Sequence, residues 1–250
     1  MALQEEMESQ GNFLFKHRGT FPIIILVIGF FIFLQTKMNS EILSNETLIQ
    51  ENIYQYLCLF ISLFGLIIRS YTVGHTPANT SGRNTSGQLA DVLNSTGIYS
   101  IVRHPLYLGN FFMWLGVAML TFNFWFIIAF IFIYWVYYER IMFAEEQFLR
   151  KKFGTTYTLW ASQTPAFIPA FKQFEKPELP FSWKKVLKKE KNGLVAVFLI
   201  FFIFYAAGCY VTNQKINNLF LIYSCILSIV LYIFLKYLKK YTKVLDETGR

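Results

Sequence analysis

The chain is poor in charged residues. Only 15% of its 250 residues are charged and 54% are hydrophobic, whereas soluble domains carry about 25% charged residues. This shortage excludes an ordinary soluble domain and favours a membrane protein. Cysteine is scarce as well, and Cys58, Cys209 and Cys225 lie in apolar runs without metal-ligand spacing. We interpret them as packing residues and expect no metal site.

Further absences narrow the possible functions. No Gly-x-Gly-x-x-Gly sequence is present, so nothing indicates a soluble Rossmann-type cofactor domain. The net charge is +8, but the basic residues cluster beside apolar runs and no nucleic-acid-binding motif accompanies them. We therefore expect the positive charge to contact anionic lipid headgroups, and we expect no nucleic-acid partner.

Long apolar runs predict an all-α, polytopic helical bundle with about six transmembrane helices. A helix needs about 20 apolar residues to cross the hydrocarbon core, and four runs reach this length. A fifth run is shorter, but residues 13–15 extend it if Lys16 and Arg18 snorkel. A sixth begins after Pro105 and either spans the bilayer or dips into it. The expected spans are residues 21–36, 53–73, 106–121, 123–143, 193–212 and 219–238.

The distribution of Lys and Arg predicts the orientation, because positive segments beside spans tend to remain in the cytoplasm. Basic residues precede the first span, occupy the loops after the second and fourth spans, and follow the last span. The loop over residues 37–52 instead has one Lys and three Glu. We therefore expect an integral membrane protein with both termini in the cytoplasm. Only Asn123 separates the third and fourth spans closely, which predicts a tight helical hairpin.

The chain divides into four expected segments. Residues 1–73 hold two transmembrane helices, and residues 74–170 form a core with a loop and the hairpin. Residues 171–192 are a basic, aromatic cytosolic linker, and residues 193–250 hold the last two spans, which we interpret as scaffold, with a basic tail. The loop over residues 74–97 is rich in Gly, Ser, Thr and Asn, and it is either a flexible connector or a lid.

Two polar segments flank the hairpin. The first runs from Gly97 to Gly109 and contains Arg103, His104 and Pro105. Pro105 can occupy the first helical position, which places the preceding cations at a positive helix end suited to a carboxylate or phosphate. Taken alone, this segment has an interfacial anchor as its alternative interpretation.

The second polar segment follows the fourth span. It contains Glu139-Arg140, then Glu145-Glu146, and a helix that can continue out of the membrane to end at Gly154. Carboxylates next to a span are costly unless they are solvated or paired. Their plain structural interpretation is an exposed helix pair between Glu146 and Arg150.

Together the two segments resemble the isoprenylcysteine carboxyl methyltransferase and phospholipid N-methyltransferase group. The shared pattern is Arg-His-Pro-x-Tyr-x-Gly, a helical hairpin, an Arg before a Glu-Glu pair, then Phe-Gly-x-x-Tyr and a segment with Pro. The resemblance covers about residues 68–169. The chain departs from it at Ile98, where relatives often have Pro, and in its last two spans. The matching residues are Arg103, His104, Pro105, Tyr107, Gly109, Arg140, Glu145, Glu146, Phe153, Gly154, Tyr157 and Pro165.

The resemblance implies a membrane enzyme that binds S-adenosylmethionine at a cytosolic interfacial site and methylates a lipid or lipid-linked acceptor. The donor carries a carboxylate, an ammonium and a sulfonium, so its pocket needs both signs of charge. We expect Arg103 and His104 near its anionic part and Glu145 at its ammonium. Gly109 would let the donor or a neighbouring helix approach. The expected cofactor-binding residues are Arg103, His104, Pro105, Tyr107, Gly109 and Glu145.

Catalytic roles are expected from Glu139, Arg140 and Glu146. The two carboxylates are seven residues apart and share a helical face, so either could take a proton from an amine or hydroxyl or orient the acceptor. Arg140 could orient an acidic acceptor. A prenylated cysteine carboxylate, the amine of phosphatidylethanolamine and another lipid all remain open as acceptors.

Two other functions are compatible with parts of the sequence. A membrane sterol or enone reductase shares a His-Pro-x-Tyr-like segment and would use NADPH, but the Arg140 to Glu146 pattern and Phe153-Gly154 favour the methyltransferase. A transporter or assembly protein would place ionisable residues near the middle of several spans. Here the span centres are apolar and the charges gather on one face.

Overall fold

The computed structural model describes residues 2–39, 45–80 and 88–250. Within these ranges the regular elements are helices, apart from one isolated antiparallel bridge between Gly97 and Glu175. The helices are α1 (Leu3–Lys16), α2 (Thr20–Asn39), α3 (Asn45–Gly74), α4 (Pro105–Met119), α5 (Phe124–Phe153), α6 (Thr155–Gln163), α7 (Trp183–Val211) and α8 (Leu219–Tyr241), with short 3₁₀ turns η1 (Ile98–Ser100) and η2 (Phe171–Gln173).

The composition of the long helices fits a membrane. By length and hydropathy α2, α3, α5, α7 and α8 can each cross one, and α4 is a shorter apolar helix. Their outer faces leave large apolar side chains uncovered, such as Phe31 and Phe60, each 66% exposed. Such faces suit contact with lipid rather than water. The predicted all-α polytopic membrane bundle is confirmed.

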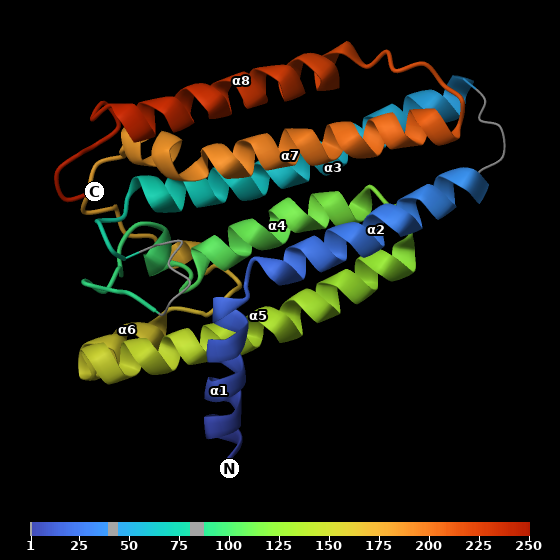
Figure 1. Ribbon diagram of the computed structural model, residues 1–250. Coiled ribbons are helices and arrows are strands. Elements are labelled where there is room, and N and C mark those ends of the chain that lie inside the picture. Colours follow the sequence, from blue (N-terminus) through green and yellow to red (C-terminus); the bar gives the residue numbers. More distant parts are fainter. Residues whose placement is uncertain (1, 40–44, 81–87) are drawn as a thin grey trace.

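The long helices run side by side in alternating directions, in the chain order α2, α3, α4, α5, α7 and α8 (Figure 1). As a result, four sets of described residues lie at one end of the bundle (Figure 1): 17–19, 75–80 with 88–104, 164–182 and the C-terminal residues. The α4–α5 connection and the α7–α8 connection lie at the other end. Asn123 caps α5 by accepting a hydrogen bond from the Phe126 N–H at 2.9 Å. The predicted tight hairpin is therefore confirmed as α4 and α5.

Close packing of α4 against α3 positions the first polar segment. Gly65 and Gly109 face each other, and a Cβ added at Gly109 would lie 2.6 Å from Cγ of Arg69 and 2.8 Å from the carbonyl oxygen of Gly65. Only glycine allows backbones to approach this closely. Deeper in the bundle, α2, α3, α4, α7 and α8 share a core that contains Phe33, Cys58, Leu120, Phe201 and Leu221.

Substituting Gly109 with alanine is expected to destabilise the bundle by about 1–3 kcal/mol, because the new methyl group overlaps backbone that cannot move freely. Thermal unfolding of the detergent-purified protein measures this effect. Gly19→Ala is the matched control, since a Cβ at Gly19 meets nothing within 4 Å. Equal melting temperatures for the two variants would contradict the packing described for α3 and α4.

The structure departs from the sequence expectations at two places. Residues 13–15 do not extend the first span, because they belong to the separate helix α1, which ends at Lys16 before α2 begins at Thr20. Helix α1 packs instead across α5, where Gly11 lies against the backbone of Arg140 (Figure 1). The second departure is that α7 begins at Trp183, so the boundary expected at residue 192 falls inside a helix.

Candidate functional site

A pocket of about 540 Å³ opens at the end of the bundle where the C-terminus and the segments before α4 and after α6 lie. This volume is within the usual range for small-molecule sites, about 300–1,000 Å³. The pocket is lined by Phe15, Arg18, Gly19, Arg69, Val73, Asn79, Thr80, Gln88, Leu89, Ala90, Val92, Leu93, Asn94, Tyr99, Arg103, His104, Pro105, Leu106, Tyr107, Asn110, Tyr138, Glu145, Phe148, Leu149, Trp160, Lys189 and Glu190. Of the loop expected to be a connector or lid, residues 81–87 lie outside the described residues, and parts on both sides of them line the pocket.

The first polar segment is held in place by its backbone. Pro105 occupies the first turn of α4, as predicted, and His104 is the residue immediately before the helix. The backbone N–H of Arg103 donates to the Pro165 carbonyl at 2.9 Å, and that of His104 donates to the Ala166 carbonyl at 3.2 Å. The segment after α6 thus fixes the direction in which both side chains leave the chain.

The second polar segment meets the first from α5. This helix continues to Phe153 and ends at Gly154, whose φ of 54° suits glycine, as the sequence predicted. His104 lies between its two carboxylates: Nε2 is 2.9 Å from Oε1 of Glu146, and Nδ1 is 3.5 Å from Oε2 of Glu145. Residues more than 40 positions apart in the sequence therefore converge at one imidazole.

These carboxylates control the charge of His104, whose side chain is only 5% exposed. Burial lowers the pKa of His104, but hydrogen bonds and attraction from Glu145 and Glu146 outweigh burial and raise it above its ordinary value of 6.5. The imidazolium form is thus stabilised at the mouth of the pocket. Beside it, the ring of Tyr107 stacks on the imidazole with centroids 5.6 Å apart.

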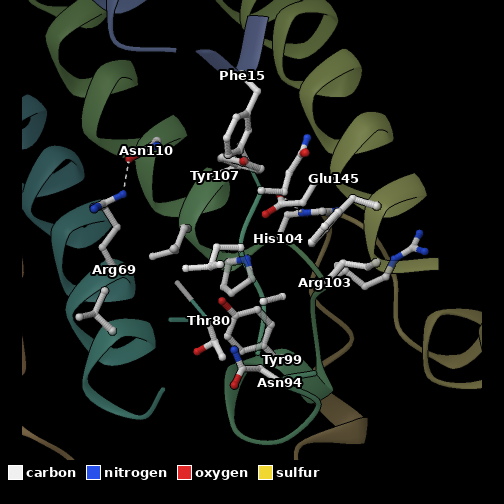
Figure 2. Close-up of a pocket in the computed structure, with 18 of the residues that line it drawn as sticks. Phe15, Arg69, Thr80, Asn94, Tyr99, Arg103, His104, Tyr107, Asn110 and Glu145 are labelled. Atoms are coloured by element: carbon white, nitrogen blue, oxygen red, sulfur yellow. Dashed lines mark hydrogen bonds and ion pairs between the residues drawn. The ribbon is translucent and has the colours of Figure 1, made fainter. Parts of the chain in front are cut away.

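Arg103 and Glu146 form a pair on the outer side of His104. The guanidinium NH1 lies 3.2 Å from Oε2 of Glu146, and Figure 2 shows it directed away from the centre of the pocket. Tyr157 is buried beside the same pair, where burial and the Glu146 carboxylate raise the pKa of its phenol well above the usual value. Glu146 therefore has its partners across the hairpin, and the alternative interpretation as an exposed pair with Arg150 does not describe its contacts.

Some residues expected at the site lie elsewhere. Glu139 and Arg140 pair with each other at 3.6 Å beside α1, and neither lines the pocket. Gly109 faces α3 and allows the helices to approach. Glu146 touches the pocket residues Arg103 and His104 without lining the pocket itself.

Several pocket residues were not predicted from the sequence motifs. Arg69 lies in a predicted span, and Glu190 lies in the basic stretch interpreted as a linker. Tyr99 was part of the first polar segment but received no role. Burial and the nearby Glu145 carboxylate raise the pKa of Tyr99 well above its usual value, so it stays a neutral phenol. An isolated Arg near the end of a span could have signalled Arg69, because such residues are costly without a partner.

Comparisons with known proteins agree with the motifs. The pattern of the phospholipid methyltransferase family matches residues 53–156. The protein-S-isoprenylcysteine O-methyltransferase of Saccharomyces cerevisiae is 27% identical over 150 residues, 60% of this chain and 61% of the relative. That of Schizosaccharomyces pombe is 32% identical over 120 residues, 47% of this chain and 50% of the relative. Protein-S-isoprenylcysteine O-methyltransferase B of Arabidopsis thaliana is 33% identical over 120 residues, 44% of this chain and 60% of the relative.

The chain spans about half to three-fifths of the length of these curated relatives. No solved structure gives a significant match. The family match contains both polar segments and the hairpin between them, the part of the chain that builds most of the pocket. The resemblance deduced from the motifs is confirmed: over this core, the chain is similar to the integral membrane methyltransferases of the isoprenylcysteine and phospholipid methyltransferase group.

Proposed function

We propose that this protein transfers a methyl group from S-adenosylmethionine to a lipid-linked acceptor, and that the acceptor is the carboxylate of a prenylated cysteine. The observation that carries the proposal is the convergence of His104 and Glu145 on one pocket at the end of a membrane bundle. The names of the relatives support the prenylcysteine carboxylate over the amine of a phospholipid.

The side chains of the pocket fit this methyl donor. The Glu145 carboxylate, 31% exposed, suits the ammonium, while the buried imidazolium of His104 at the N-terminus of α4 suits the carboxylate. Tyr99 and Tyr107 offer aromatic surface for the adenine. When bound, S-adenosylmethionine supplies a methyl group on a positively charged sulfur that leaves as a neutral sulfide.

The remaining site residues act through these groups. Glu146 holds His104 and Arg103 in position, since it contacts both. Pro105 starts α4 without an N–H to satisfy, and Gly109 keeps α4 close to α3. A carboxylate acceptor is already ionised at neutral pH, so transfer to it requires alignment more than a general base. Transfer to a carboxylate therefore does not require Glu139 or Arg140 to contact the reacting atoms.

The orientation follows from the basic residues. Lys16 and Arg18, the basic first turns of α7 and the tail after α8 all lie at the end that holds the pocket. Positive segments tend to remain in the cytoplasm, so we place the pocket and both termini on the cytosolic side. Exposed apolar side chains of the same end, including Ile168, Phe171 and Trp183, suit contact with the headgroup layer.

The proposal is tested with purified full-length protein, labelled S-adenosylmethionine and three acceptors. We expect label to be transferred to S-farnesylcysteine with a free carboxylate, and not to its methyl ester or to phosphatidylethanolamine vesicles. Thermal stability should rise with S-adenosylmethionine and stay unchanged with NADPH, because only a bound ligand stabilises the fold. Label in the phospholipid alone would contradict the carboxylate acceptor, and stabilisation by NADPH alone would contradict the methyl donor.

A further inference from the structure

A second charged cluster lies on the pocket, outside both sequence motifs. Arg69 of α3 donates from Nε to Oε2 of Glu190 at 2.9 Å and from NH2 to Oε1 at 2.7 Å. The Glu190 side chain, on α7, is only 5% exposed, and that of Arg69 is 15% exposed. Such two-point pairing fixes the plane of a guanidinium as well as its position.

A third helix completes the cluster. Arg69 also donates from NH1 to Oδ1 of Asn110, on α4, at 2.7 Å. The contact of Arg69 with Asn110 depends on the close approach of α3 and α4 at Gly65 and Gly109, where the Arg69 Cγ atom packs against α4. The guanidinium is therefore held from two sides, and its position is set by α3, α4 and α7 together.

The cluster forms the wall that faces His104 and Glu145. Figure 2 shows Arg69 and Asn110 on one side of the pocket, His104 and Glu145 on the other, and Tyr107 between them. A guanidinium carries more N–H donors than these three bonds use. Arg69 lines the pocket, so the remaining donors are available to a ligand there.

The two walls present different groups to the methyl donor and to the acceptor that must bind beside it. The proposed donor uses the wall of His104 and Glu145, which carries both signs. The opposite wall carries the guanidinium of Arg69, held by the carboxylate of Glu190 and the side chain of Asn110. A carboxylate that enters beside the donor finds a preoriented guanidinium on that wall, whereas Arg140 lies outside the lining.

We propose that Arg69 binds the carboxylate of the acceptor and determines the preference for an acidic acceptor, and that Glu190 is a positioning residue that holds Arg69 in place. The inference rests on the proposed function for the identity of the acceptor. It assigns to α7, which lies beyond the family match at residues 53–156, a part in substrate recognition.

Binding of two probes to the full-length protein, without methyl donor, tests this inference. N-acetyl-S-farnesylcysteine and its uncharged carboxamide share the same lipid, so the ratio of their affinities reports recognition of the carboxylate alone. We expect the wild type to prefer the acid by about tenfold or more, as for a hydrogen bond to a charged group. Arg69→Gln should abolish the preference. Arg69→Lys keeps the positive charge but lacks the planar guanidinium that makes two-point contacts, so it should retain part of the preference.

Glu190→Gln separates positioning from charge. Loss of the two-point contact should weaken binding of the acid about tenfold and raise its KM, while kcat and the KM of S-adenosylmethionine change less than about twofold. Removal of the negative charge by itself would instead tighten binding of the acid, and that result would overturn the positioning role. Asp246→Asn is the control, because it breaks a neighbouring exposed pair of α7, with Lys188 at 2.5 Å, away from the pocket.

The outcomes distinguish this inference from the proposed function. Because the binding measurement needs no turnover, a wild type that prefers the acid but transfers no methyl group contradicts the proposed function and supports the carboxylate site. A wild type that transfers methyl groups but binds both probes equally overturns the role of Arg69. An unchanged acid preference in Arg69→Gln, with weaker binding of S-adenosylmethionine, would overturn it as well.

Discussion

Replacing His104 with alanine is expected to lower the affinity for S-adenosylmethionine by at least about 100-fold. The substitution removes the cation that lies between Glu145 and Glu146 and leaves their carboxylates without it. In the proposed complex it also removes the cation that pairs with the carboxylate of the donor. Truncating one partner of a buried, hydrogen-bonded charge pair in a binding interface costs about 2–5 kcal/mol, and each 1.4 kcal/mol is about tenfold in affinity. Calorimetric titration of the detergent-purified variant with the methyl donor measures the loss.

His17→Ala is the matched control for this substitution. His17 is exposed between α1 and α2, where its Nδ1 lies 2.9 Å from the carbonyl oxygen of Phe13. Its loss should leave donor affinity within about twofold, as for surface substitutions away from a site. A His104→Ala protein that folds and binds the donor within about threefold of the wild type would contradict the site assignment.

Replacing Glu146 with glutamine is expected to make stability less dependent on pH. Since the folded-state pKa of His104 lies above 6.5, its charge contributes stability fully below pH 6.5, and that contribution is lost as the pH rises through the folded-state pKa. The variant loses one of the two carboxylates that raise this pKa. In the variant, the charge of His104 should contribute less to the free energy of unfolding, by roughly 1.5–3 kcal/mol at acidic pH. As the pH rises, this contribution should be lost at a lower pH than in the wild type.

Thermal unfolding of both proteins between pH 5.5 and about 9 measures this difference, a range chosen to bracket the ordinary histidine pKa. The gap in melting temperature should be widest at acidic pH and should narrow as the pH rises. The pair between Arg103 and Glu146 adds a part of the gap that does not vary with pH. Glu139→Gln is the control on the same helix, because Glu139 is 45% exposed and pairs with Arg140 alone among the described contacts. A gap of equal size at every pH would show that His104 is not the titrating group.

Much of the fold could be predicted from composition and periodicity. Spans are set by the thickness of the hydrocarbon core, so apolar runs located the membrane-crossing part of each long helix. Helices α3, α5 and α7 extend eight to ten residues beyond the predicted spans at one end. The predicted extension of the first span by residues 13–15, which relied on their hydrophobicity alone, was wrong. Phe15 is apolar, but it lies in α1 and packs in the buried cluster with Tyr107 and Tyr138 instead of lengthening α2. Hydropathy does not tell apart a side chain that faces lipid from one that faces another helix.

The site could be predicted in part, because its first wall is built from side chains in contiguous motifs. His104, Glu145 and Glu146 were identified through the family resemblance of the motifs on either side of the hairpin, and the structure brings them into contact. Arg69 and Glu190 are 121 positions apart, each isolated in the sequence, so only the packing of α7 on α3 reveals their pairing. Glu139 and Arg140 lie close to the motif in sequence, but the helical turn carries them towards α1.

The hydrogen bonds from the backbone of Arg103 and His104 have a practical consequence for anyone who shortens this chain. A truncation designed on the family match would stop at residue 156 and discard the carbonyl groups of Pro165 and Ala166 that accept those bonds. It would also discard Glu190, leaving the guanidinium of Arg69 without its carboxylate. Any piece able to assemble the whole cavity must therefore contain at least Phe15 to Glu190, well beyond residues 53–156 that the family pattern matches.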